Sequence, residues 1–154
     1  MRLYLLQHAE AKREQEDPNR DLTEKGRADI TKVAKHLEGL GLKVSQVFHS
    51  GKTRARTTAE ILAARLKPVK GVSETDGLAP LDDPKVWAER ASNLMEDVAL
   101  VGHLPHLARL AGLLLCGKAE KSAVNFHMGG VVCLNRTDAG TWGLEWVLIP
   151  ELLL

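Results

Sequence analysis

The chain has few of the residues and runs that mark secreted or membrane-spanning proteins. It contains only two cysteines, Cys116 and Cys133, which lack metal-ligand spacing, so we expect two buried, reduced thiols rather than a disulfide framework. The longest apolar stretch, residues 104–116, is broken by a proline, a histidine and an arginine. A membrane helix needs about 20 apolar residues, so no span is expected.

An excess of charge of either sign is also absent. Twenty-one basic residues balance twenty acidic ones, which gives no reason to expect nucleic acid or an acidic membrane as a partner. Only four apolar residues follow Arg2, too few for a signal peptide, so we expect a cytoplasmic protein. A length of 154 residues predicts one domain spanning residues 1–154.

What the chain does have is an alternation of buried strands and amphipathic helices. Apolar runs predict strands at residues 3–6, 44–49, 69–72, 98–101, 131–135 and 142–149. Apolar residues at i, i+3, i+4 and i+7 predict helices after Thr23, after Ser50-Gly51, over residues 85–95 and from Leu104-Pro105 onward. This order predicts an α/β fold with a mixed sheet, closed by an antiparallel hairpin turning at residues 137–140.

Polar side chains of one chemical kind follow three of these strands. Gln7-His8 ends the first strand, Ser50 to Arg54 follows the second, and Gly102-His103 follows the strand at 98–101. Ligands of open α/β sheets bind at the carboxyl ends of strands, so we expect these groups to converge. Two imidazoles, a guanidinium and a helix N-terminus together suit a phosphoryl group. A neutral imidazole can act as the nucleophile.

Four motifs, in order, resemble those of the histidine phosphatase (phosphoglycerate mutase-like) superfamily, and most closely the small SixA-type phosphohistidine phosphatases. They are LLQHAEA at residues 5–11, DLTEKG at 21–26, SGKTRARTT at 50–58 and VGHLP at 101–105. The resemblance implies a three-layer αβα sandwich with a mostly parallel mixed sheet. It makes His8 the nucleophile and places Arg54 and His103 on the phosphoryl oxygens. It implies neither metal nor cofactor.

We expect three further residues, Gln7, Ser50 and Gly129, to contribute to substrate binding. Gln7 and Ser50 belong to the motifs, and the loop at residues 127–130 is expected to border the site. Gln7 stands where the family has arginine. Candidates for the missing charge are Arg13, Arg20, Lys52 and Arg56, among which the sequence does not choose.

A second departure concerns the general acid. The glutamate of larger relatives aligns with Gly77, and Glu10, Glu74 and Asp76 are the nearest carboxylates in sequence. An alkoxide leaving group needs a proton from such an acid, whereas a phosphorylated imidazole departs more easily. The sequence therefore favours a metal-independent phosphatase acting on phosphohistidine in a protein. The alternatives are a phosphatase of a small phosphate ester, a non-catalytic phosphoryl-binding module, and a metal-dependent phosphoesterase with His8 and His103 as ligands.

Overall fold

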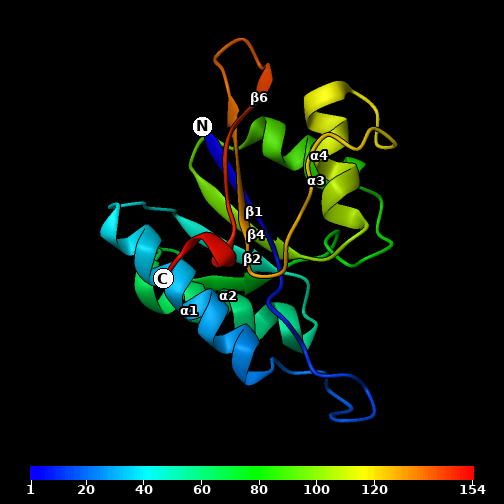
Figure 1. Cartoon of the computed structure of the whole chain (residues 1–154). Helices are drawn as coiled ribbons and strands as arrows, with labels where there is room; N and C mark the ends of the chain where they lie inside the picture. The colour runs from blue at the N-terminus through cyan, green and yellow to red at the C-terminus, as the bar shows by residue number, and fades with distance from the viewer.

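The computed structural model describes residues 1–154, whose six strands form one mixed sheet (Figure 1). The strands are β1 (Arg2–Gln7), β2 (Gln46–His49), β3 (Val72–Glu74), β4 (Val98–Gly102), β5 (Val131–Arg136) and β6 (Trp142–Leu148). Their order across the sheet is β3-β2-β4-β1-β5-β6. The first four strands in sequence run parallel to one another, and β5 is antiparallel to both β1 and β6.

Helices cover both faces of the sheet, which gives the three layers that were expected. The helices are α1 (Glu24–Gly39), α2 (Thr53–Leu66), α3 (Lys85–Asn93) and α4 (His106–Cys116), with a short 3-10 turn, η1 (Pro150–Leu152), near the C-terminus. Figure 1 shows α1 and α2 together on one side of the sheet, with α3 and α4 on the other. No helix is long and apolar enough to cross a membrane.

Each face of the sheet has its own hydrophobic core because successive side chains of a strand point to opposite faces. Tyr4 and Leu6 of β1 pack with the buried residues of α1 and α2, whereas Leu3 and Leu5 pack with those of α3 and α4. All four side chains are buried. The nearly unbroken apolar run at the N-terminus therefore marks a central strand, and the sheet position of β1 agrees with this.

The ends of α1 follow from its sequence. The Thr23 side chain caps the helix by accepting a hydrogen bond from the Gly26 backbone N–H at 3.0 Å, as its position predicted. The apolar stripe of Ile30, Val33 and Leu37 is buried against the sheet. Gly26 has a tighter role, because a Cβ there would collide with the backbone carbonyl of Glu10. The start of α1 is thus pressed against the segment that follows β1.

Two expectations from the sequence were wrong. The third strand lies at Val72–Glu74 rather than at residues 69–72, because residues 69–70 form a turn in which Val69 is 90% exposed. The apolar composition of that short run did not reflect burial. Cys116 was expected to be buried, but it is the last residue of α4 and is exposed, while Cys133 in β5 is buried; both are free thiols.

Candidate active site

Three adjacent strands of the sheet end beside one another and carry the residues of the candidate site. Gln7 of β1 pairs with Gly102 of β4, and His49 of β2 pairs with Val101 of β4. The next residues along the three strands are His8, His103 and Ser50. Because neighbouring parallel strands end in register, the structure brings these three residues together, as the sequence predicted.

His8 is held in one tautomer by its own backbone. Its Nδ1 lies 2.8 Å from the carbonyl oxygen of Ala9, which can only accept a hydrogen bond, so Nδ1 carries the proton. The other nitrogen, Nε2, therefore has a free lone pair when the ring is neutral. Burial, together with the charges of Arg54 and Arg20, lowers the pKa of His8 to about 4. Near neutral pH this imidazole is uncharged and can attack an electrophile.

His103 lies beside His8, with ring centroids 5.1 Å apart, and contacts Ser50. The Ser50 hydroxyl is 2.6 Å from His103 Nε2 and accepts a hydrogen bond from the Lys52 backbone N–H at 3.3 Å. When the hydroxyl donates its proton to Nε2, the ring proton of neutral His103 lies on Nδ1. That buried Nδ1 has no hydrogen-bond partner. Burial, together with nearby cationic groups including Arg54 and Lys52, lowers the pKa of His103 to about 3.

Arg54 lies in the first turn of α2, where the sequence placed it. Its Nε is buried and has no hydrogen-bond partner, and burial followed by the charge of Arg20 lowers its pKa. The start of α2 also lacks a side-chain cap, because its N-cap residue is Lys52. Free N–H groups at a helix N-terminus and an unpaired guanidinium nitrogen both favour the binding of an anion.

Thr58 connects the two halves of the site and was not singled out from the sequence, although it closes the third motif. This buried hydroxyl accepts a hydrogen bond from the Ala9 backbone N–H at 3.0 Å and donates one to the Arg54 carbonyl at 2.7 Å. The segment carrying His8 and the helix carrying Arg54 are thus joined through one side chain. The signal that could have identified it is the fixed spacing of Arg54 and Thr58 by one helical turn.

Gln7 and Gly129 lie beside this cluster in different roles. The Gln7 side chain makes no protein hydrogen bond and lines an open cavity of about 340 Å³ with Glu10, Leu104 and His127, among others. Gly129 adopts a left-handed φ of 75°, and its backbone N–H donates to the Gln7 carbonyl at 3.0 Å. That N–H is already used within the fold, so the role of Gly129 is to hold the end of β1 in place.

Two of the three carboxylates near the site in sequence are directed elsewhere. Asp76 is exposed and pairs with Arg90 at 2.9 Å, which holds the pKa of its carboxyl below the usual range. Glu74 pairs with Arg56 at 3.2 Å. Gly77, which occupies the position of the family glutamate, has a left-handed φ of 82°, and a Cβ there would lie 2.9 Å from a methyl group of Val86. Glu10 lines the cavity next to Gln7 and is the only one of the three carboxylates that does so.

The remaining histidines lie outside the cluster of His8, Ser50, Arg54 and His103. His49 accepts a hydrogen bond from the Gly51 backbone at 3.0 Å, which is a structural role. His106 is fully buried in the first turn of α4, and this burial lowers the pKa of its imidazole. No three His, Cys, Asp or Glu side chains lie together in a way that could hold a metal ion.

Comparison with known proteins identifies relatives of this chain in sequence and in fold. The chain is 36% identical over 142 residues to an uncharacterized protein of Picosynechococcus, covering 87% of this chain and 84% of that one. It is 37% identical over 91 residues to the mouse mitochondrial serine/threonine-protein phosphatase PGAM5, covering 55% of this chain but only 31% of the relative. The structure of the protein histidine phosphatase SixA complexed with tungstate superposes with a TM-score of 0.87 over 98% of both chains, at 21% identity. The model of the histidine phosphatase superfamily (branch 1) matches residues 3–82, and the chain belongs to this family.

Proposed function

We propose that this chain is a metal-independent phosphatase that forms a phosphohistidine intermediate on His8 and acts on phosphohistidine carried by a protein. The observation that carries the proposal is a pair of buried side-chain nitrogens without partners. Arg54 Nε and His103 Nδ1 both belong to the cluster around His8. A buried donor without a partner costs about 1–3 kcal/mol, so such groups call for a ligand. A phosphoryl group offers oxygen acceptors to both.

The chemistry follows from the protonation states. Neutral His8 attacks phosphorus through Nε2, the bond from phosphorus to the leaving group breaks, and the leaving group takes up a proton from solvent. Arg54, His103 and the N-terminus of α2 bind the phosphoryl oxygens and stabilise the charge that develops on them. Water then attacks phospho-His8, which releases inorganic phosphate and restores the imidazole. Dividing the transfer in this way replaces one difficult step by two easier ones.

The electrostatics of the site favour a leaving group that needs no general acid. The ionisable groups that shift the pKa values of His8 and His103 are arginine, lysine and histidine side chains, with no carboxylate among them. Asp76 and Glu74 are held by arginines. A phosphorylated imidazole departs far more readily than a serine or sugar alkoxide, so it suits such a site. Similarity to SixA, named as a protein histidine phosphatase, supports the same substrate.

The test compares leaving groups under identical conditions. We expect phosphohistidine in a protein and phosphoramidate to be hydrolysed faster than phosphoserine, by a factor on the order of the 10²–10⁴ usually credited to a general acid. Activity must persist in the presence of a chelator. Comparable rates on phosphoserine would contradict the phosphohistidine assignment and favour the chemistry suggested by the name of PGAM5. In that case Glu10→Gln, at the carboxylate beside Gln7, should lower the phosphoserine rate selectively.

Because Gln7 replaces the family arginine, a non-catalytic phosphoryl-binding function is the second candidate, and the same assays test it. A chain that binds inorganic phosphate yet hydrolyses neither phosphoramidate nor para-nitrophenyl phosphate would be a phosphoryl-binding module. Para-nitrophenyl phosphate also has a good leaving group, so the absence of a general acid could not explain a failure to hydrolyse it. Loss of activity with chelator would instead favour a metal-dependent phosphoesterase. Each of these results would overturn the proposed function.

A further inference from the structure

The cavity beside Gln7 is lined by neighbours of the two imidazoles. Gln7 precedes His8 at the end of β1, and Leu104 follows His103 just beyond β4, so the cavity adjoins the candidate active site. The loop at residues 126–128 closes another side. The cavity volume of about 340 Å³ lies at the lower end of the range for ligand pockets, which suits one long side chain.

One wall of this cavity is apolar and partly open to solvent. It is formed by Leu104, which is 39% exposed, Met128, which is 45% exposed, and the half-buried Phe126. A bridge between Met128 and Gln7 holds this wall against the end of β1. Apolar surface exposed beside a site is stabilised when an aliphatic chain covers it, and methionine adapts well to such a partner.

The facing wall carries three carboxylates but only one ammonium group. Asp29, which is 9% exposed, holds the ammonium of Lys25 at 2.6 Å, so these two charges balance. Glu10 lies 4.0 Å from the same ammonium, at the outer limit of an ion pair, and Glu151 is exposed and has no ion-pair partner. Negative charge is therefore in excess in the cavity.

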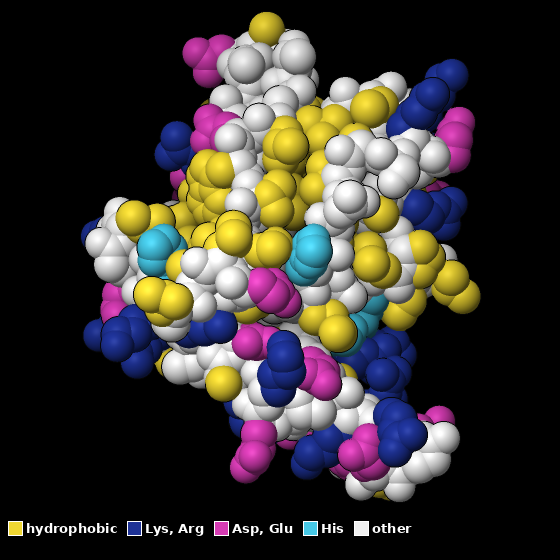
Figure 2. All heavy atoms as spheres, in the orientation of Figure 1, with side chains coloured by type: hydrophobic (Ala, Val, Ile, Leu, Met, Phe, Trp, Pro, Cys, Tyr) yellow, Lys and Arg dark blue, Asp and Glu magenta, His cyan; other side chains and the backbone are white.

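Both kinds of surface are accessible from one side of the molecule. Figure 2 shows acidic, hydrophobic and histidine side chains next to one another near the middle of this face, where the end of β1 meets the loop before β5 in Figure 1. The Gln7 amide, which has no protein hydrogen-bond partner, lines the same cavity. One ligand can therefore contact an aliphatic surface, an amide and unneutralised carboxylates together.

Lysine and arginine side chains have the chemistry that matches these walls. Their methylene stems pack on apolar surface while the charged end reaches polar groups. An acidic side chain would be repelled by the carboxylates, and a wholly apolar one would leave Glu10 and Glu151 without a partner. Because the phosphoryl group of the substrate would bind at His8, next to this cavity, the cation belongs to a residue close to the phosphohistidine.

We propose that this cavity binds a lysine or arginine side chain that flanks the phosphohistidine of the substrate protein, with its stem on Leu104 and Met128 and its charged end at Glu10 and Glu151. The inference rests on the proposed function, because it names the side chain recognised beside the same site. Glu10 and Glu151 then select the substrate without contacting phosphorus. Their effect should appear mainly in KM, because the contact is the same in the ground state and the transition state.

The test uses phosphohistidine peptides of one length in which a single lysine is moved through successive positions around the phosphohistidine. At the best position, lysine is compared with arginine, glutamine, leucine and glutamate. We expect lysine and arginine to give a kcat/KM about tenfold above glutamine or leucine, through KM, and glutamate to give the lowest value. High salt should reduce the preference, because the carboxylates are partly exposed.

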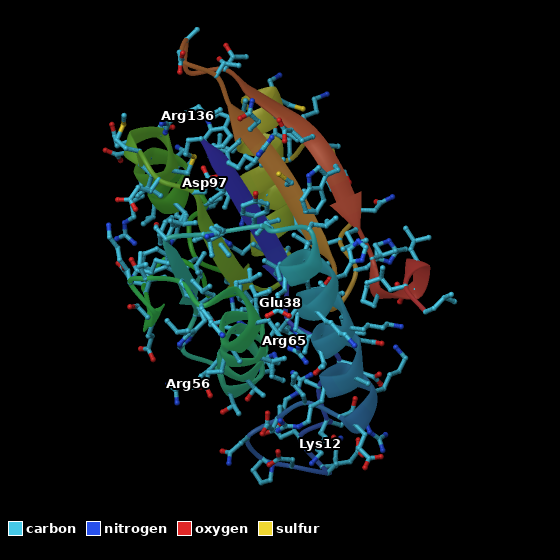
Figure 3. All side chains as sticks on the ribbon, turned by 90° about the vertical axis from the view of Figure 1, so that its left-hand side faces the viewer. Lys12, Glu38, Arg56, Arg65, Asp97 and Arg136 are labelled. Carbon is cyan, nitrogen blue, oxygen red and sulfur yellow. The ribbon has the colours of Figure 1, made fainter.

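Three variants assign the preference to this cavity. Glu10→Gln/Glu151→Gln should bring the lysine and glutamine peptides within threefold of each other. Glu151→Lys should favour the glutamate peptide over the lysine peptide, which a merely structural defect would not do. Glu38→Gln is the control with the same loss of one carboxylate, and it should keep the preference: Glu38 pairs with Arg65 at 3.3 Å near the C-terminal end of α1, far from the loop that carries Lys12, as Figure 3 shows.

The proposal is overturned if wild type hydrolyses all the peptides with kcat/KM values within threefold, if leucine is preferred to lysine, or if the lysine preference survives in the double variant. Each of these results would leave the proposed function in place. Affinity for the same peptides is measured separately with His8→Asn, which cannot form phospho-His8. Tighter binding of the lysine peptide by His8→Asn, with no hydrolysis of any peptide by wild type, would support the subsite and refute the proposed function.

Discussion

Acidification should destabilise this protein through the imidazoles of its candidate site. Burial holds the pKa of His8 at about 4 and that of His103 at about 3, whereas an unfolded histidine titrates near 6.5. Between these values the unfolded chain takes up protons that the folded chain cannot accept. The free energy of unfolding is therefore unaffected well above pH 6.5 and falls as the pH drops from there toward the folded pKa values. Each imidazole should cost about 2 kcal/mol between pH 7 and pH 5.

Urea unfolding at about pH 7 and about pH 5 would measure this loss in wild type, His8→Gln and His103→Gln. Glutamine cannot take up a proton, so the loss in each variant should be smaller than in wild type by about 2 kcal/mol. His36→Gln is the control, because His36 is exposed on α1 and its replacement should leave the loss unchanged. Equal losses in wild type and both site variants would mean that the imidazoles are not held neutral by burial. His8 would then not be the ready nucleophile described above.

Two other substitutions test the framework around the site. Thr58→Val should lower the free energy of unfolding by about 1–3 kcal/mol, because it leaves the buried Ala9 N–H without an acceptor, and it should also reduce turnover, while Thr58→Ser retains both. Gly26→Ala should destabilise by about 1–3 kcal/mol in thermal or urea unfolding because its methyl group meets the Glu10 carbonyl, whereas Gly39→Ala, which has open space around it, should be neutral or slightly stabilising. A harmless Thr58→Val or Gly26→Ala would contradict the close contacts between the His8 segment and its neighbours.

The sequence predicted the parts of this molecule that depend on local pattern. The apolar runs of β1 and β4 identify central strands, and the polar residues directly after them, His8 and His103, converge because parallel strands end at one edge. Thr23 likewise predicted the start of α1. Short apolar runs were less reliable: Val69 is exposed because a turn replaces the expected strand.

Contacts between distant segments could not be predicted in the same way. The hydrogen bond from the Thr57 hydroxyl to the Asp21 carboxylate joins the β1–α1 loop to α2 across 36 residues, and no local pattern indicates it. The misfit at Gly77 also depends on a distant element, because the methyl group that a side chain would meet belongs to Val86 of α3. Hydrogen-bond partners of this kind depend on how loops pack against helices, and no periodicity in the sequence records that packing.

The most direct test of the account is to identify the phosphorylated residue during turnover. Wild type mixed with radiolabelled phosphoramidate and quenched in alkali should carry an acid-labile, alkali-stable label, which mass spectrometry should place on His8. His8→Asn should take up no label and lose turnover, while folding like wild type. Turnover by wild type without any label on His8, a label on another residue, or a tenth or more of the wild-type rate in His8→Asn would contradict the central claim.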